Sequence, residues 1–145
     1  MQFTTKIALS IVALYLAYSV SKKFKYFNLS EFADHYSNAN KIDPSVVQRL
    51  DKAREIAKVP FIVDSGYRDE NHPESIKNPT SSHIKGLAVD IATTPETQSI
   101  IYNALKKAGF IRLGVGSNFV HADMDYDKDK YITWFYDGRP TIKWS

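Results

Sequence analysis

The sequence has no cysteine, no internal repeat and no low-complexity stretch. Without cysteine the chain can form no disulfide and no thiolate metal site. Its sequence therefore does not indicate whether it is in an oxidising or a reducing compartment. A length of 145 residues fits one domain that can bury a hydrophobic core of its own. Hydrophobic residues make up 43% of the chain and aromatic residues 13%, which indicates a folded globular protein rather than a disordered one.

An excess of positive charge is also missing from most of the chain. The sequence has 19 Lys and Arg against 16 Asp and Glu, but Lys6, Lys22, Lys23 and Lys25 precede the first acidic residue, Glu31. Subtracting these four leaves 15 basic against 16 acidic residues in the remainder. Nucleic-acid binding needs clustered positive charge on the folded domain, so the sequence argues against a nucleic-acid partner.

One uncharged stretch stands near the N-terminus, from Ile7 to Val20, with lysines on both sides. As a helix it would be about 21 Å long, shorter than the ~30 Å hydrocarbon core of a bilayer. That length fits a signal peptide, and Ala17-Tyr18-Ser19 is an acceptable cleavage site. A short anchor fits too, because flanking lysines can reach the interface. We therefore expect a hydrophobic N-terminal helix at residues 7–20 that contacts a membrane, within an anchor or signal segment of residues 1–25.

The lysines around this stretch bear on location. More lysines follow it than precede it, which by the positive-inside rule favours a C-terminal domain kept inside, whereas an exporting signal would show the reverse bias. The expected location is a single-pass membrane anchor or an exported protein, in a phage virion or a bacterial envelope. The alternative is a buried helix of the folded domain.

Residues 26–145 are expected to form one domain with mixed helices and strands. A helix should begin at Pro44, because Asp43 is a good N-cap and proline suits the first helical position. A second helix should follow Thr94 and stop at Gly109. Residues 70–80 are polar and read as a loop. The expected strands cover residues 61–63, 87–92, 110–115, 119–124 and 132–136.

The order of these elements indicates the fold class. Helices and strands do not alternate regularly, which favours an α+β fold with a small, mostly antiparallel sheet and flanking helices. Strand 87–92 places Leu87, Val89 and Ile91 on one face and Asp90 on the other. In the same way, strand 119–124 places His121 and Asp123 on one face.

Three residues are candidate metal ligands: His83, Asp90 and His121. Gly86, between the first two, allows a sharp change of direction before the strand. Two imidazoles and one carboxylate suit Zn²⁺, and three protein ligands leave a position open for water. Bound zinc can lower the pKa of that water and polarise a peptide carbonyl.

The wider pattern resembles the D-alanyl-D-alanine carboxypeptidase family of zinc peptidases. That family includes wall-cutting phage endolysins and vancomycin-resistance dipeptidases, and hedgehog signalling domains share its fold. The resemblance covers about residues 26–136. It rests on Ser65-Gly66-Tyr67-Arg68, Ser81-x-His83-x-x-Gly86-x-Ala88-x-Asp90 and His121-x-Asp123.

The resemblance implies a role for each of the matching residues. His83, Asp90 and His121 would bind one zinc ion. Arg68 would contact the scissile carbonyl or the substrate carboxylate, a task suited to a guanidinium group. Substrate contacts would come from Ser81, Tyr67 and, as a wall of the cleft, Trp134.

One position departs from the family pattern. Many relatives carry Glu or Asp three residues before the last histidine as general base, whereas this chain has Asn118, which cannot accept a proton at neutral pH. Asp123 is the best replacement because it shares the face of His121. Asp123 could instead fix the ring of a ligand histidine.

The sequence thus predicts zinc-dependent hydrolysis of peptide bonds in the stem peptides of bacterial peptidoglycan. The enzyme would be a D,D-carboxypeptidase or an endopeptidase of the endolysin kind. The alternative, motivated by Asn118, is a catalytically weak or inactive metal-binding module, in a membrane-tethered cell-wall-binding or virion structural protein.

Overall fold

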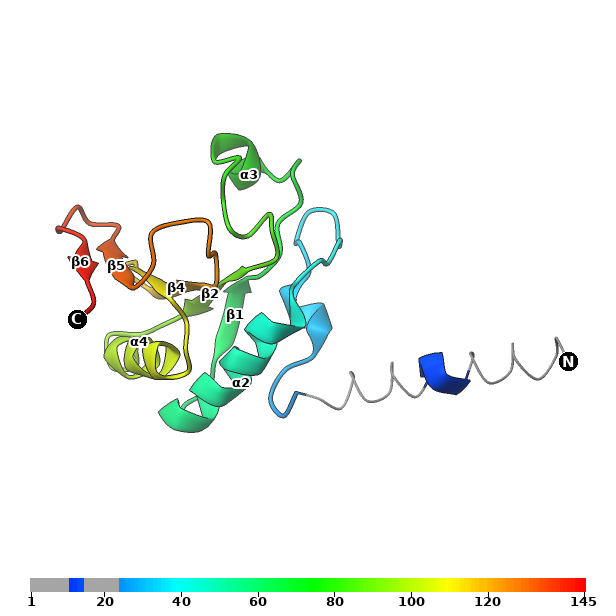
Figure 1. Ribbon diagram of the computed structural model, residues 1–145, viewed down its shortest axis with the longest axis horizontal. Helices are drawn as coiled ribbons and strands as arrows, with labels where there is room; N and C mark the ends of the chain where they lie inside the picture. The colour runs from blue at the N-terminus through cyan, green and yellow to red at the C-terminus, as the bar shows by residue number, and fades with distance from the viewer. Residues whose placement is uncertain (1–10, 15–23) are drawn as a thin grey trace, which may run out of the picture.

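The computed structural model describes residues 11–14 and 24–145. Residues 24–145 form an α+β fold with one six-stranded sheet, in the order β1-β2-β4-β3-β5-β6. The elements are the 3-10 helix η1 (Leu29–Phe32), α2 (Pro44–Ala57), β1 (Ile62–Ser65), α3 (Pro73–Lys77), β2 (Ala88–Ala92), α4 (Gln98–Lys107), β3 (Arg112–Val115), β4 (Phe119–Asp123), β5 (Ile132–Phe135) and β6 (Ile142–Lys143) (Figure 1).

Helix α2 forms where its capping residues predict it. The Asp43 carboxylate accepts a hydrogen bond from the backbone N–H of Ser45, and Pro44 occupies the first helical position. The helix ends at Lys58, whose φ of 57° is left-handed. One face of the helix is fully buried, through Val46, Val47, Leu50 and Ala53.

Helices α2 and α4 contact one another and cover one face of the sheet (Figure 1). The alternation of side chains along the central strands supplies the apolar surface that they cover. The strand residues in this core are Val89 and Ile91 of β2, Leu113 of β3, and Val120 and Ala122 of β4. All five are fully buried, so the opposite face of the same strands is the one left for polar side chains.

The prediction of an α+β fold is confirmed, but the sheet is mixed because β3 and β5 pair in parallel. Strand β4 runs antiparallel to β3, so it ends at Asp123 beside Arg112, the first residue of β3. The segment after β4 therefore starts at the end of the sheet where β3 begins. There the backbone N–H of Tyr131 donates to the carbonyl of Ile111, so β5 starts beside the start of β3 and follows its direction. The other four strand pairings are antiparallel.

The segment expected to be a loop, residues 70–80, contains the short helix α3. Its capping residue is His72, whose ring Nδ1 accepts a hydrogen bond from the backbone N–H of Glu74 (3.1 Å), and Pro73 takes the first helical position. The helix has only five residues, and its sequence is polar and shows no helical period of apolar residues. For this reason the sequence indicated a loop.

Most of the expected hydrophobic N-terminal helix lies outside the described residues. Residues 11–14 are helical, and their side chains are exposed. Across the described ranges, 11–14 and 24–145, no helix is both long and apolar enough to cross a bilayer.

Candidate metal centre

The polar face of the sheet carries a row of side chains from neighbouring strands. Asp90 at the middle of β2 lies directly opposite His121 of β4, and His121 lies opposite Gly114 of β3. On the outer side, Asp90 pairs with Ser65 of β1, next to an irregularity in the β1–β2 register. Because paired residues point to the same face, the register brings one carboxylate and one imidazole together.

The turn before β2 brings His83 to the same place. The backbone N–H of Gly86 donates to the carbonyl of His83 (3.1 Å), which closes the turn. Gly86 has φ +70°, and a Cβ atom there would lie 1.9 Å from the carbonyl oxygen of Lys41. Any other residue would therefore be both strained and blocked, so Gly86 is required for the position of His83.

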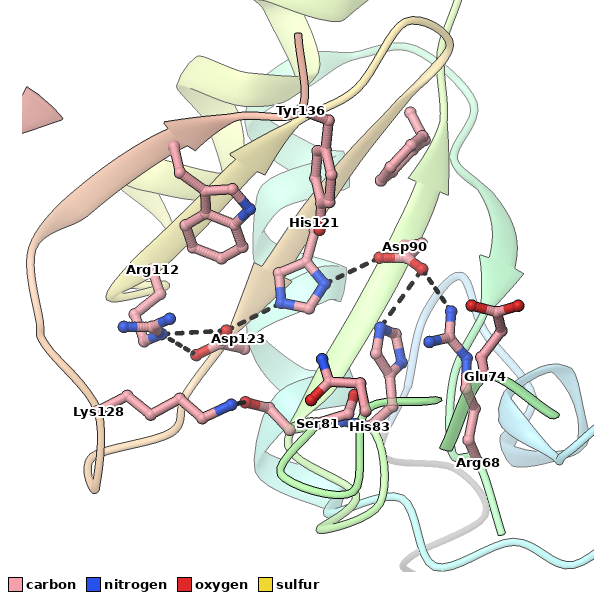
Figure 2. A pocket seen from close by; sticks show the side chains of 14 residues that line it. Arg68, Glu74, Ser81, His83, Asp90, Arg112, His121, Asp123, Lys128 and Tyr136 are labelled. Carbon is pink, nitrogen blue, oxygen red and sulfur yellow. Dashed lines mark hydrogen bonds and ion pairs between the residues drawn. The ribbon is translucent and has the colours of Figure 1, made fainter. Parts of the chain in front are cut away.

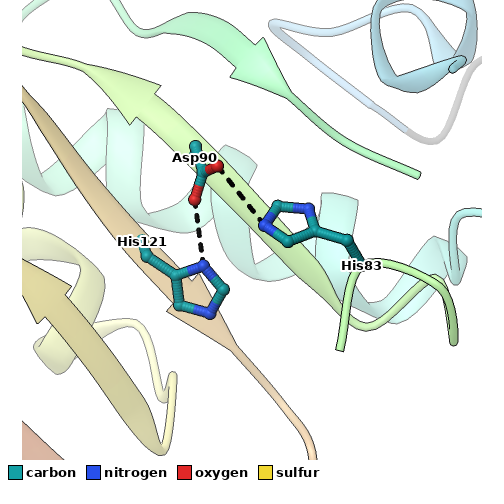
Figure 3. Close-up of side chains that lie close together, drawn as sticks. All are labelled: His83, Asp90 and His121. Carbon is teal, nitrogen blue, oxygen red and sulfur yellow. Dashed lines mark hydrogen bonds and ion pairs between the residues drawn. The ribbon is translucent and has the colours of Figure 1, made fainter. Parts of the chain in front are cut away.

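His83, Asp90 and His121 form a compact cluster (Figure 3). One ligand atom from each lies within 4.8 Å of the other two. Both histidines point a ring nitrogen at the Asp90 carboxylate: His121 Nδ1 lies 2.9 Å from Oδ1, and His83 Nε2 lies 3.3 Å from Oδ2. All three residues are buried, so their mutual contacts replace most of their contact with water.

The outer nitrogen of each histidine is also occupied. His83 Nδ1 donates to the carbonyl oxygen of Gly66 at 2.7 Å, and His121 Nε2 lies 2.9 Å from the Asp123 carboxylate. Such contacts select the ring tautomer. In the neutral rings, they leave His83 Nε2 and His121 Nδ1 as lone-pair atoms that face each other across Asp90. Two imidazole nitrogens and one carboxylate oxygen, with no thiolate, form a donor set that fits Zn²⁺.

The cluster has strongly coupled charges. Burial alone would raise the pKa of Asp90, but hydrogen bonds from His121 and His83 outweigh it and hold that pKa below its usual range. Burial disfavours the charged form of His121, yet its contacts with Asp123 and Asp90 raise its pKa to about 9. Burial lowers the pKa of His83 despite the Asp90 contact. At neutral pH the His121 ring of the metal-free cluster therefore carries a proton on both nitrogens and is positively charged. It lies between the carboxyl groups of Asp90 and Asp123.

Asp123 and Arg112 form an ion pair beside the cluster. Arg112 Nε lies 3.2 Å from Asp123 Oδ1, and Asp123 also accepts a hydrogen bond from the backbone N–H of Asp125 (3.0 Å). Together with the His121 contact, these bonds occupy both carboxylate oxygens of a side chain that is only 1% exposed. Asp123 lines the pocket, and its hydrogen bonds place it to orient the His121 ring.

Arg68 lies on the other side of Asp90. Its Nη2 donates to Asp90 Oδ2 at 2.9 Å, and its Nε donates to the Ser65 hydroxyl at 2.9 Å. The backbone N–H of Arg68 donates to the carbonyl of His83 (3.2 Å). The guanidinium is therefore held by Asp90 and Ser65, the backbone is fixed to His83, and further guanidinium N–H groups remain for a ligand.

These side chains line a pocket of about 460 Å³ on the polar face of the sheet (Figure 2). A pocket of that size can hold a small peptide segment or ligand. The residues that line it are Arg68, Glu74, Asn78, Ser81, Ser82, His83, Asp90, Arg112, Phe119, His121, Asp123, Lys128, Trp134 and Tyr136.

The pocket includes all but one of the residues that the sequence singled out for the site. The exception is Tyr67, which is 5% exposed and does not line the pocket. It follows Gly66 on the chain, and its backbone N–H donates to the carbonyl of Phe32 (2.8 Å). The motif that contains Tyr67 therefore contributes Arg68 to the pocket, while Tyr67 itself is buried.

Trp134 forms one wall of the pocket because β3 has a glycine beside it. The ring centroids of Trp134 and His121 are 5.3 Å apart. A Cβ atom on Gly114 would lie 2.5 Å from the Trp134 ring, so only glycine lets the indole lie across β3. On the other side the Arg112 guanidinium stacks at 5.1 Å from the ring centroid of Trp134.

Several pocket residues were not identified from the sequence. Arg112 is the cross-strand partner of Asp123, which only the register reveals. Lys128 donates to the carbonyl of Thr80 (2.7 Å) and to the Ser82 hydroxyl (3.1 Å), so it joins two segments far apart in the chain. Glu74 reaches the pocket from α3, in a segment that the polar composition had indicated to be a loop.

Asn118, the position of the usual base, is exposed and does not line the pocket. Asn118 lies in the bend between β3 and β4, directly before the first residue of β4, and its side chain is turned to solvent rather than toward His121. In the segment after β4, Asp125 is fully buried and accepts a hydrogen bond from the Ser82 hydroxyl (2.8 Å).

Comparison with known families places these observations in context. A family model described as Peptidase M15 matches residues 25–123. The matched region contains the whole His83–Asp90–His121 cluster together with Arg68 and Asp123, and it ends before Trp134. No curated protein matches the chain.

Proposed function

This chain belongs to the peptidase M15 family, and on that premise we propose that it hydrolyses peptide bonds in the stem peptides of bacterial peptidoglycan, with one zinc ion. Family membership supports a metallopeptidase. The observation that carries the proposal is the convergence of His83, Asp90 and His121, whose ligand atoms lie within 4.8 Å of one another. His121 is far from the other two residues along the chain, so their proximity is a property of the fold.

His83 through Nε2, His121 through Nδ1 and Asp90 through its carboxylate would hold the ion. When bound, zinc supplies Lewis acidity that polarises a peptide carbonyl and lowers the pKa of water. The protein contributes fixed ligand orientations, because Gly66 and Asp123 hold the outer nitrogens of the two rings. A site that is rigid before binding loses little entropy when it binds.

Arg68 would bind the negatively charged part of the substrate. Its guanidinium is held by Asp90 and Ser65 at the edge of the pocket, with N–H groups left for a carboxylate or for the developing oxyanion. The Ser81 hydroxyl accepts the backbone N–H of His83 (3.3 Å), and it donates to no other residue in the described part of the chain, so its hydrogen can be donated to substrate. Trp134 would pack against the apolar part of the peptide.

We assign Asp123 a positioning role rather than that of a general base. Both of its carboxylate oxygens already accept hydrogen bonds, from His121, Arg112 and the backbone of Asp125. A proton acceptor must reach the water that it deprotonates, and a 1% exposed carboxylate with these partners does not.

Both carboxylate oxygens of Asp123 accept hydrogen bonds, and Asn118 is exposed. These two observations favour a second candidate function. A protein with these ligands and without a base in the usual place could bind metal and cell-wall peptides with weak or no hydrolysis. This second candidate is a membrane-tethered wall-binding or virion structural module, and it needs the same metal cluster.

We also propose that residues 7–20 hold the chain at a bilayer, as a retained anchor. The support is the uncharged stretch of the sequence and the lysines that flank it.

The test uses the full chain purified in detergent, with purified peptidoglycan and zinc. New free amines without released D-alanine would indicate an endopeptidase, and released D-alanine would indicate a carboxypeptidase. His83→Ala should lose bound zinc and hydrolysis together, while the matched control His35→Ala, at an exposed position, should keep both. Hydrolysis that survives His83→Ala would refute the assignment. A wild-type protein that binds zinc but yields no product at any pH would establish the non-catalytic module.

A further inference from the structure

The segment that follows the N-terminal apolar stretch is fixed to helix α2. The backbone N–H groups of Lys25 and Tyr26 donate to the two oxygens of Asp51, at 2.6 and 3.0 Å. The Lys25 ammonium pairs with Glu55 at 3.0 Å, and the Tyr26 hydroxyl bonds to the same carboxylate. Phe24 belongs to the buried core. The chain is therefore held at the surface of α2 from Phe24 onward.

This attachment limits how far the domain can be from the apolar stretch. The stretch ends at Val20, so only residues 21–23 separate it from Phe24. Even fully extended, that connection spans at most about 14 Å. If residues 7–20 are in a bilayer, the surface of α2 around Phe24 must lie close to the lipid headgroups.

The same surface carries positive charge. Lys25, Lys52 and Lys58 are exposed, Lys25 pairs with Glu55, and Arg54 lies beside the Tyr26 ring. These four basic side chains stand against two acidic ones, Asp51 and Glu55, so the surface keeps a net positive charge. The sequence adds Lys22 and Lys23 directly before this surface. Lysines at this distance from a membrane are attracted to anionic lipids.

The pocket lies on the other side of the sheet. In Figure 2 the translucent α2 lies behind the strands, while Asp90, His121 and Asp123 project in front of them. In Figure 1 α2 lies at one end of the domain and α3, which contributes Glu74 to the pocket, lies at the other. A domain that rests on α2 would therefore turn its pocket away from the surface beneath it.

We propose that the α2 surface around Phe24, with Lys25, Lys52 and Lys58, docks on an anionic lipid bilayer, and that the pocket thereby opens away from the membrane. This rests on the proposed anchoring through residues 7–20. The orientation matches a substrate that lies beyond the membrane surface, such as a polymer, rather than a peptide attached to a lipid headgroup. A long flexible connection would leave the direction of the pocket unspecified.

The absence of native cysteine permits a direct test of orientation with single labels. The full chain is reconstituted in vesicles of phosphatidylcholine with about one-third phosphatidylglycerol and a lipid-attached energy acceptor. A donor dye is placed at Gln48→Cys on α2 or at Lys77→Cys on α3, both exposed positions outside the proposed lipid-contacting lysines. Energy transfer to the bilayer should be at least twofold more efficient from position 48 than from position 77. Equal or reversed efficiencies in vesicle-bound protein would overturn the proposed orientation.

Vesicle flotation separates this inference from the proposal on which it rests. A full chain that does not float with vesicles of any composition would refute the anchoring itself. A chain that floats but shows equal transfer from both positions would keep the anchoring and refute the docked orientation.

A charge variant tests the role of the lysines, with the donor dye again at Gln48→Cys on α2. Lys52→Glu with Lys58→Glu should at least halve the excess transfer from position 48 over position 77, whereas the control Lys143→Glu, on β6, should not change it. Vesicles without phosphatidylglycerol should reproduce the effect of the double variant. Unchanged transfer in both conditions would overturn the assignment of these lysines to lipid contact.

Discussion

The two faces of the central sheet are built from the same strands and differ in the interactions that hold their side chains. On the helix-covered face, Val89, Leu113 and Val120 pack against α2 and α4 without a polar contact. On the other face, Asp90 and His121 hold one another through directed bonds of 2.9 Å. Dispersion contacts tolerate a change of partner, whereas a hydrogen-bonded charge does not. Substitution on one face should therefore affect stability, and substitution on the other should affect metal binding.

The largest effect is expected on the polar face, from Asp90→Asn. The change keeps the volume of the side chain and removes the charge that faces both histidines and Arg68. We expect hydrolysis to fall by more than about 10³-fold and zinc affinity by more than the ~10–100-fold that follows loss of an outer contact to a ligand. Metal content and turnover of peptidoglycan would measure both.

Asp64→Asn is the matched control, since it makes the same change at an exposed position of the neighbouring strand β1. It should leave both quantities unchanged. Full zinc occupancy in the Asp90 variant would mean that the cluster is not the metal site.

On the apolar face, Leu113→Ala should destabilise the fold by about 2–5 kcal/mol, because the side chain is fully buried and its removal leaves a cavity. Zinc stoichiometry should remain that of the wild type at temperatures where the variant is folded. Urea unfolding and metal analysis would measure the two properties, and Ile142→Ala, at an exposed position, is the control. Loss of zinc binding from a folded Leu113→Ala protein would show that the two faces are not separable.

The apolar face could be predicted from sequence because its signal is local. The alternation of Leu87, Val89 and Ile91 with Asp90 predicts which side of the strand is buried, and the structure agrees for the residues of β2. The Asp43–Pro44 pair likewise predicts the start of α2. Capping and period depend on neighbours a few residues apart, which the sequence displays directly.

The arrangement of the polar face depends on register, which the sequence does not display. That Asp90 faces His121 and that Arg112 faces Asp123 follows from which strands pair and at which offset. The candidate ligands were selected by residue type and spacing and supported by a family resemblance, but neither shows that the three side chains meet. The parallel placement of β5 beside β3 is also a property of the assembled sheet, so the direction of that strand was missed.

A smaller effect on the polar face is expected from Asp123→Asn. The variant keeps a side chain that can still accept from Arg112 but weakens the contact that orients the His121 ring. We expect zinc affinity to fall about 10–100-fold while the fold remains intact. A competition titration with a chelator would measure the loss, with Asp127→Asn, whose side chain is 87% exposed, as the control. Unchanged affinity with lost hydrolysis would instead identify Asp123 as the proton acceptor.

The smallest effect concerns pH and the proton on His121. Burial opposes this proton, but Asp123 and Asp90 raise the pKa of His121 from 6.5 to about 9. Because the folded-state pKa is the higher one, the stabilisation of the metal-free protein is complete below pH 6.5 and is lost as pH rises toward 9. Zinc must displace the same proton from Nδ1, so its apparent affinity should rise about tenfold per pH unit between pH 7 and 9.

The rise of zinc affinity with pH should correspond to one proton released per zinc ion. Burial lowers the pKa of His83, so that ring is already neutral and its metal-facing nitrogen has no proton to release. Zinc titrations by calorimetry at about pH 6, where water on the bound zinc keeps its protons, would count the protons released by the ligands, in buffers of different ionisation enthalpy. One proton per zinc would place the charge of the metal-free cluster on His121. No release would mean that the Asp90 and Asp123 carboxylates face a neutral ring, and the stability of the metal-free protein would then show no loss between pH 6.5 and 9. Because this pH dependence depends on the His121 ring, His121→Phe should remove it from the metal-free protein.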